Sequence, residues 1–142
     1  MGYTNYWRLN DSKKEFSPVI IGKVKKIYAT YREVYGQKLC AGYFDRTQDP
    51  IANKTHIQFN APTDDTGEDF GIDQKFDWDC FCKTCREQYD AAVKAVLMVL
   101  ASADYITQWH FDGDVEDEEF KEALKLLEKT GIKYTDKMKP RT

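Results

Sequence analysis

The sequence predicts an α+β domain in which about three helices pack on a mainly antiparallel sheet. Three observations predict it: segments that alternate apolar and polar residues, segments with apolar residues at helical spacing, and a length of 142 residues, typical of one domain. The expected order is strand, helix, two strands, a weakly signalled strand, helix, strand and helix. We expect residues 1–133 to form the domain and residues 134–142 to form a polar C-terminal tail.

The N-terminal part contains a strand and a helix. Residues 3–9 alternate, which predicts a strand with Tyr6 as the aromatic residue on its second face. Ser17 followed by Pro18 is typical of a helix start, and Gly36 of a helix end. The expected buried stripe of this helix comprises Ile20, Val24, Ile27, Tyr31 and Val34.

Two strands are expected at 38–44 and 55–61, joined by a turn near Asp49 and Pro50. The polar, acidic segment 62–73 reads as a surface loop, and a short strand at 72–76 is weakly indicated. Composition also predicts a strand at 105–111.

The second helix has the clearest pattern. Thr84 and Glu87 form a capping box, which predicts that the helix begins at Thr84. From 91 to 101 only Lys94 is polar, so we expect this helix to lie between the sheet and a second layer or a second subunit. The protein is therefore expected to be a homo-oligomer.

A third helix is expected to be capped by Asp114 and to end at Gly131. Its expected buried stripe comprises Val115, Phe120, Leu124 and Leu127.

Composition and charge exclude several classes of protein. The chain is 42% hydrophobic and 32% charged, which excludes a disordered, collagen-like or purely coiled-coil polypeptide. A net charge of −3 argues against duplex nucleic acid or an anionic membrane as the main partner. The sequence has no run of about 18 apolar residues, so we expect no membrane span. Residues 1–14 lack the apolar run of a signal peptide. We expect a cytoplasmic protein.

The cysteines and histidines carry weak signals for chemistry. Cys80, Cys82 and Cys85 could hold zinc only with a fourth ligand, which would be Cys40, His56 or His110. The alternative is that they are free thiols, of which the buried ones simply pack. Cys82 and His110 could pair as nucleophile and base, but no HExxH, GxSxG or Walker pattern accompanies them. We expect no catalytic residues, no metal and no cofactor.

Lys83, Thr84 and Arg86 surround the predicted start of the second helix. The free N–H groups and the positive end of the macrodipole at such a start favour a phosphate or carboxylate. Arg86 could grip a phosphate with two hydrogen bonds, and Thr84 could donate one. The alternative is that Thr84 only caps the helix and that Arg86 pairs with an acidic neighbour, namely Asp79, Glu87 or Asp90.

The aromatic content is high, with nine Tyr, eight Phe and three Trp. Tyr6, Trp7 and Tyr89 could each offer a ring face to a nucleobase, and Asn60 could donate a hydrogen bond to it. The alternative for these rings is packing in the core. Tyr89 is the strongest aromatic candidate because it lies near the expected anion site.

Two motifs, Gly2-Tyr-Thr-Asn-Tyr-Trp7 and Phe81-Cys-Lys-Thr-Cys-Arg-Glu-Gln-Tyr-Asp90, resemble a family of short phage-borne and bacterial proteins of unassigned activity. These proteins open with a YTxYW-like motif and carry an FCKTxRxPYD-like segment ahead of an apolar helix. This chain differs at Gln88, where a proline is usual, and has Cys85 at the variable place. The phage association implies an inhibitor of host defence, and some such proteins are sponges that bind cyclic nucleotide signals.

We therefore expect an anti-defence protein that binds a cyclic dinucleotide or a related nucleotide signal without cleaving it. The expected ligand-binding residues are Tyr6, Trp7, Asn60, Lys83, Thr84, Arg86 and Tyr89. A second hypothesis is a protein-binding inhibitor whose acidic segments, 64–69 and 114–129, mimic nucleic acid. A third is a nucleotide hydrolase in which Asp77, Asp79 and Asp90 hold a metal ion.

Overall fold

The computed structural model describes residues 3–63, 67–73 and 80–141, and it confirms the α+β class. The strands are β1 (Thr4–Leu9), β2 (Ile51–Ala52), β3 (His56–Phe59), β4 (Phe70–Asp73), β5 (Phe81–Lys83) and β6 (Ile106–Phe111). The helices are α1 (Pro18–Tyr35), α2 (Asp90–Ser102), α3 (Glu118–Lys129) and a short 3-10 helix, η1 (Asp136–Met138). No helix in these described ranges is both long and apolar enough to cross a membrane.

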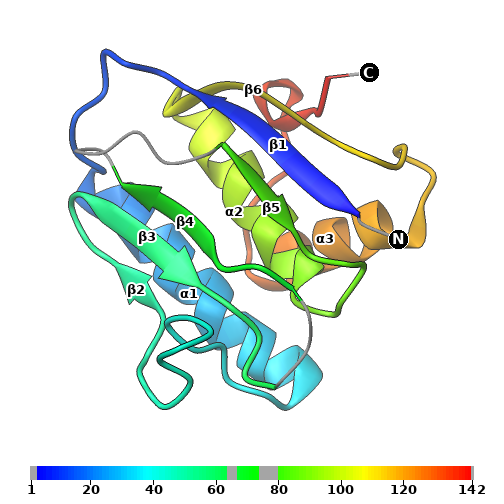
Figure 1. Ribbon diagram of the computed structural model, residues 1–142. Helices are drawn as coiled ribbons and strands as arrows, with labels where there is room; N and C mark the ends of the chain where they lie inside the picture. The colour runs from blue at the N-terminus through cyan, green and yellow to red at the C-terminus, as the bar shows by residue number, and fades with distance from the viewer. Residues whose placement is uncertain (1–2, 64–66, 74–79, 142) are drawn as a thin grey trace.

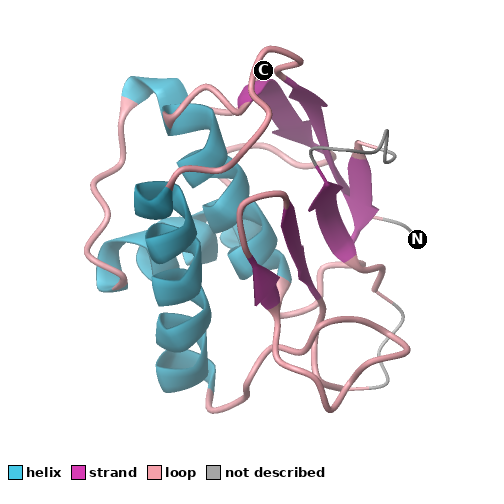
Figure 2. Cartoon of the chain, turned by 90° about the vertical axis from the view of Figure 1, so that its left-hand side faces the viewer, coloured by secondary structure: helices cyan, strands magenta, loops and turns pink. Residues whose placement is uncertain are grey.

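The strands form two small sheets rather than one. One sheet has the order β5-β1-β6 and the other β2-β3-β4, and every pairing is antiparallel (Figure 1). Figure 2 shows the helices on one side of the molecule and the strands on the other. Each sheet therefore has an inner face toward the helices and an outer face that no helix covers.

Helix α1 begins and ends as predicted. The Ser17 hydroxyl accepts a hydrogen bond from the Ile20 N–H at 3.3 Å, and Gly36 ends the helix in the left-handed region, with a φ of 72°. The expected stripe is wrong at its last position, because Val34 is exposed. Tyr35 turns inward instead, and its hydroxyl donates to the Glu122 carboxylate on α3 at 2.9 Å.

Helix α2 begins at Asp90, so the prediction of a start at Thr84 is wrong. Cys85 and Arg86 have φ values of 55° and 59°, which are left-handed rather than helical. Residues 84–87 instead close a tight turn, in which the Glu87 N–H donates to the Thr84 carbonyl at 3.0 Å. The Thr84 side chain bonds Asp90, as described below, and does not cap a helix.

One chain is enough to cover the apolar helix α2. Residues 91–101 are all buried, and α2 contacts α1, α3, η1 and β6 of the same chain. Its apolar composition is therefore explained without a second subunit, and the homo-oligomer stays a prediction.

The predicted strand at 38–44 is wrong. That segment makes only isolated bridges, from Cys40 to Asn60 and from Gly42 to Asp45. The strands at 3–9, 55–61 and 105–111 are confirmed as β1, β3 and β6 within one to two residues. The strand expected at 72–76 overlaps β4 at residues 72–73 only, and residues 74–76 lie outside the described residues. The expected surface loop at 62–73 is wrong at its end, where Phe70, Gly71 and Ile72 are buried in β4. The sequence analysis also missed β2 and β5, whose two and three residues are too few to show a period.

The C-terminal elements also differ in part from expectation. Helix α3 follows Asp117 rather than Asp114, whose N–H donates to the Asp117 carboxylate at 3.1 Å in the turn before the helix. Val115 is therefore exposed and outside the buried stripe. The expected tail packs on the domain, because Trp109 Nε1 donates to the carbonyl of the buried Met138 at 2.8 Å.

Candidate functional site

Strand β1 runs through the centre of its sheet and presents a different chemistry to each side. Tyr3, Asn5 and Trp7 are buried, while Tyr6 is half-buried and Arg8 is exposed. The predicted alternation is confirmed from Asn5 to Arg8, whereas Thr4, on the same face as Tyr6, is buried. The inner and outer faces of sheet β5-β1-β6 are therefore separate candidate sites.

On the inner side, the Asp90 carboxylate accepts hydrogen bonds from three side chains. Asn5 Nδ2 and Thr84 Oγ1 donate to Asp90 Oδ1 at 2.7 and 2.6 Å, and Lys94 Nζ donates to Asp90 Oδ2 at 2.5 Å. All four side chains are essentially fully buried. We call these residues, Asn5, Thr84, Asp90 and Lys94, the Asp90 cluster.

The Lys94 ammonium is the most perturbed group of the Asp90 cluster. Burial lowers the pKa of Lys94, and the neighbouring Asp90 carboxylate opposes that shift. The ammonium also lies 4.5 Å from the Tyr3 ring centroid and 4.4 Å from that of Phe111, so aromatic faces replace part of its hydration. The cluster is a closed internal ion pair in which the Thr84 hydroxyl is already engaged.

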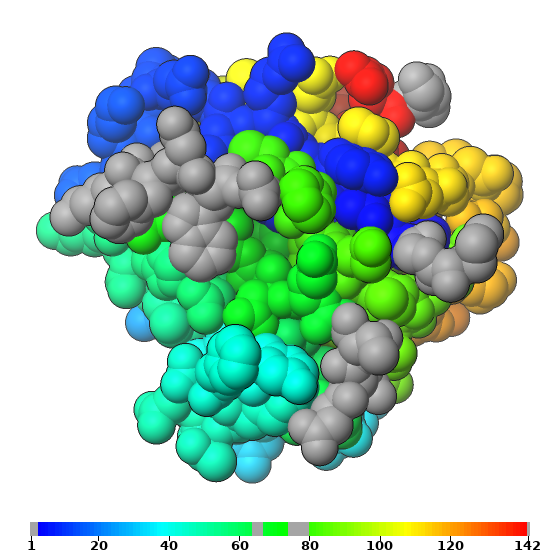
Figure 3. All heavy atoms as spheres, viewed as in Figure 1, coloured from blue at the N-terminus to red at the C-terminus, as the bar shows by residue number. Residues whose placement is uncertain are grey.

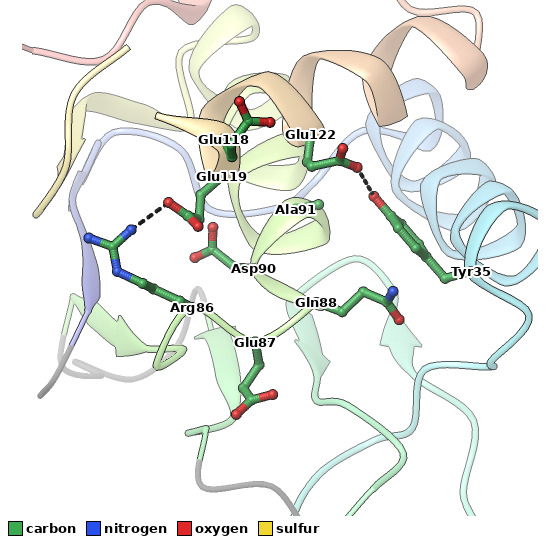
Figure 4. A pocket seen from close by; sticks show the side chains of 9 residues that line it. All are labelled: Tyr35, Arg86, Glu87, Gln88, Asp90, Ala91, Glu118, Glu119 and Glu122. Atoms are coloured by element: carbon green, nitrogen blue, oxygen red, sulfur yellow. Dashed lines mark hydrogen bonds and ion pairs between the residues drawn. The ribbon is translucent and has the colours of Figure 1, made fainter. Parts of the chain in front are cut away.

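Arg86 lies at a pocket of about 320 Å³ beside this cluster (Figure 4). Its guanidinium donates to the Glu119 carboxylate at 2.6 Å and lies over the Tyr3 ring at 4.4 Å. Five of the residues lining the pocket are acidic, namely Glu87, Asp90, Glu118, Glu119 and Glu122. The negative charge of these carboxylates outweighs the positive charge of Arg86, so this pocket suits a cation better than a phosphate.

Three other expected site residues are buried. The Tyr89 ring is fully buried and its hydroxyl donates to the Glu68 carbonyl at 2.7 Å; burial raises the pKa of Tyr89. Trp7 packs on Phe70 with 5.1 Å between ring centroids. Asn60 Nδ2 donates to the Asp69 carboxylate at 2.7 Å. In this structure none of the three offers a free ring face or amide to a ligand.

The outer face carries aromatic side chains on all three strands. Tyr6 on β1 pairs in register with Phe81 on β5 and with His110 on β6. The Tyr6 and His110 rings stack with 4.7 Å between centroids and 15° between planes, and Phe81 is 43% exposed. We call Phe81, Tyr6 and His110 the aromatic row.

The sequence analysis found one member of the aromatic row and missed two. Alternation along β6 places His110 on the face opposite Trp109, so the sequence pattern was sufficient to predict its face. The register that joins His110 and Phe81 to Tyr6 could not be predicted from the pattern, because it couples segments far apart in the sequence.

Two cations accompany the aromatic row. Lys83 lies two residues from Phe81 on β5 and Arg8 lies two residues from Tyr6 on β1, so both share the outer face. Both are exposed, and in the described part of the chain neither forms an ion pair. Figure 3 shows this face, with β1 in dark blue beside β6 in yellow. Of the seven expected site residues, Tyr6 and Lys83 meet here.

Two further pockets complete the description. One, of about 310 Å³, lies at the end of β6 and is lined by His110, Phe111, Gly113, Asp114, Val115, Pro140 and Arg141; we call it the β6 pocket. The other, of about 640 Å³, carries Lys23, Lys133 and Lys137 but no aromatic ring among its described lining residues. The β6 pocket adjoins the aromatic row, through His110.

The residues expected for metal chemistry do not form a described site. Among residues 3–63, 67–73 and 80–141, no group of three or more His, Cys, Asp or Glu side chains could hold a metal ion. Cys82 is buried and its thiol donates to the Glu68 carbonyl at 3.4 Å, and burial raises the pKa of that thiol. Asp64, Asp65, Asp77 and Asp79, which two of the hypotheses invoke, lie outside the described residues.

Comparison with protein families, with curated proteins and with solved structures gave no match for this chain.

Proposed function

We propose that this protein binds a nucleotide on the outer face of sheet β5-β1-β6 and sequesters it without cleaving it. The base stacks on the aromatic row, and Lys83 and Arg8 attract the phosphate. The supporting observation is that aromatic rings on three neighbouring strands, one exposed and two half-buried, share their face with two exposed cations that form no ion pair in the described chain.

Stacking accounts for the choice of ligand. Every nucleobase has a π-face, and a base stacked on an aromatic side chain contributes about 1–3 kcal/mol to binding. Exposed aromatic residues on an open sheet are the arrangement by which several nucleic-acid-binding domains hold unpaired bases. The lysine-lined pocket offers charge without a ring, and the pocket at Arg86 offers mostly carboxylates.

The groups available on the face favour sequestration over cleavage. His110 is stacked against Tyr6, and the Cys82 thiol faces the interior, so the two are not arranged as nucleophile and base. The resemblance to phage-borne proteins makes a nucleotide immune signal of a bacterial host the ligand class to test first. In that case the protein acts as an anti-defence sponge in the host cytoplasm.

Depletion and recovery of free ligand test this proposal. The purified protein is incubated with a panel of mononucleotides, cyclic dinucleotides and related signals, and free ligand is measured before and after heat denaturation. Ligand that disappears and returns intact means sequestration. Ligand that returns as product means an enzyme, and a panel from which nothing is depleted contradicts the proposal.

A Tyr6→Ala variant tests the position of the site. Loss of one stacking ring weakens binding by about 5-fold to 150-fold, which corresponds to about 1–3 kcal/mol. The matched control is Phe44→Ala, because Phe44 is 91% exposed but lies in the loop after Gly42, away from the aromatic row. Equal affinity of the two variants, measured by calorimetry, would place the ligand elsewhere.

The acidic segment around the start of α3 favours the protein-binding inhibitor as a second candidate. Its carboxylates are Asp112, Asp114, Glu116, Asp117, Glu118, Glu119 and Glu122. Such a run attracts a basic protein surface. A basic, nucleic-acid-binding partner that is displaced by nucleic acid would support this candidate if no nucleotide binds.

A further inference from the structure

We propose that the ligand of the aromatic row is two nucleotides joined by a phosphodiester, with the second nucleotide in the β6 pocket. This inference rests on the proposed function and specifies its ligand. Linear and cyclic dinucleotides share this chemistry.

The aromatic row and the β6 pocket share one residue. His110 stacks on Tyr6 and also lines the pocket. A base that stacks on the row therefore lies next to the pocket, and a phosphodiester can join its nucleotide to a second nucleotide in the pocket.

The lining of the β6 pocket matches one nucleoside. Its volume of about 310 Å³ lies at the lower end of the range for small-molecule sites, about 300–1,000 Å³. Phe111, Val115 and Pro140 supply apolar walls for a base or sugar. Asp114 adds a carboxylate that can accept a hydrogen bond from an exocyclic amine or a ribose hydroxyl.

Arg141 is placed to hold the linking phosphate. Its backbone N–H donates to the Trp109 carbonyl at 2.7 Å, which ties the residue to β6. Its guanidinium donates to the Gln108 side chain at 3.1 Å, and a guanidinium has five N–H donors, so others remain for a phosphate. Gln108 pairs in register with Arg8, so Arg141 extends the cationic side of the outer face.

Ligand length tests the inference. The probes are adenosine monophosphate, linear diadenylate and cyclic diadenylate, together with their guanine counterparts, each titrated against the intact protein. A linear or cyclic dinucleotide is expected to bind about tenfold or more tightly than the mononucleotide, because its second contact is intramolecular. The tighter of the two arms identifies whether the linkage is open or closed.

Two variants confine the effect to the β6 pocket. Val115→Trp fills the pocket from an exposed position and is expected to bring dinucleotide affinity to within about twofold of mononucleotide affinity. Val19→Trp, on the exposed side of α1, is the matched control and should leave the preference unchanged. Arg141→Ala should also reduce the preference, whereas Lys133→Ala, in the lysine-lined pocket, should not.

Equal affinities for mononucleotide and dinucleotide would overturn the inference and leave the proposed function standing. A preference that survives both Val115→Trp and Arg141→Ala would also overturn it, because the second nucleotide would then lie elsewhere. Failure of every probe to bind would overturn the inference and the proposed function together.

Discussion

A simple amphipathic sheet has an apolar inner face and a polar outer face. Sheet β5-β1-β6 differs from this pattern on both faces. The inner face holds the Asp90 cluster, with a lysine and an aspartate essentially removed from solvent. The outer face holds an exposed phenylalanine and a tyrosine–histidine stack. Adjacent residues of one strand, Asn5 and Tyr6, belong to these different faces.

The difference between the faces separates structural from functional polar groups. Inside, the Asp90 carboxylate is engaged by three donors of the same chain, which leaves it little capacity for a ligand. Outside, Lys83 and Arg8 are unpaired within the described residues, and the rings are in contact with solvent. Strongly perturbed buried charges often mark active sites, but here the open face is the better candidate.

Alkaline pH is expected to have the largest effect on the free energy of unfolding, and to act through buried tyrosines. Burial raises the pKa of six tyrosines above 10.0, namely Tyr3, Tyr28, Tyr31, Tyr35, Tyr89 and Tyr134. Their contribution is fully present below pH 10 and is lost as the pH rises above 10, because the unfolded state then ionises first. Urea unfolding between pH 8 and pH 11 should show a steep fall in the free energy of unfolding above pH 10.

Lys94 is expected to raise the free energy of unfolding over the same pH range in which the tyrosines lower it. Its pKa is lowered in the folded state, so its own contribution rises as the pH approaches 10.5 from below. Lys94 alone acts against six tyrosines, so a free energy of unfolding that stayed level from pH 9 to pH 11 would contradict the burial of the tyrosines.

Lys94→Met is expected to have the next largest effect. The substitution leaves a buried carboxylate without its cation, which costs about 3–5 kcal/mol of unfolding free energy. Urea denaturation at neutral pH measures this loss. The control is the double variant Asp90→Asn with Lys94→Met, which removes both charges and should recover a large part of the loss. A double variant as unstable as the sum of the two single variants would show that the charges do not act as a pair.

Arg86→Ala should have a small effect, and it tests whether Arg86 belongs to the ligand site. The Arg86–Glu119 pair is half exposed, and such pairs contribute about 0–1 kcal/mol. Nucleotide affinity should change by less than about twofold, in contrast to the loss expected for Tyr6→Ala. If Arg86→Ala abolished ligand depletion, the site would move from the outer face to the pocket at Arg86.

Tyr3→Phe is expected to have the smallest effect. The buried Tyr3 hydroxyl has no hydrogen-bond partner among the described residues, so its removal should change the unfolding free energy by less than about 0.5 kcal/mol or should stabilise the fold. The matched variant is Tyr89→Phe, which removes a hydrogen bond to the Glu68 carbonyl and should cost about 1 kcal/mol. Thermal denaturation of the pair measures the difference, and an equal loss in both would mean that the Tyr3 hydroxyl is bonded.

The helix starts show which predictions from sequence were successful. Ser17 and Pro18 start α1 as expected, because a cap needs only its own residue and the N–H groups that follow it. Thr84 has the same local signal, yet α2 begins six residues later. Its hydroxyl donates to Asp90, whose carboxylate is also held by Asn5 and Lys94, so tertiary partners outweighed the capping box.

The expected site was partly predictable for the same reason. Tyr6 was assigned to the second face of its strand because alternation is a local property of extended backbone. Tyr89 and Trp7 were named as stacking rings because composition does not say which aromatic residues the core takes, and the structure places both in the core.

Local sequence patterns were sufficient to predict the α+β class, the ends of α1 and most of the alternation of β1, because each depends on residues within one element. The start of α2, the partners of Asp90 and the meeting of Phe81, Tyr6 and His110 on one face became visible in the folded chain alone. These features depend on strand register and on buried hydrogen bonds between distant segments, whose energies no local pattern records.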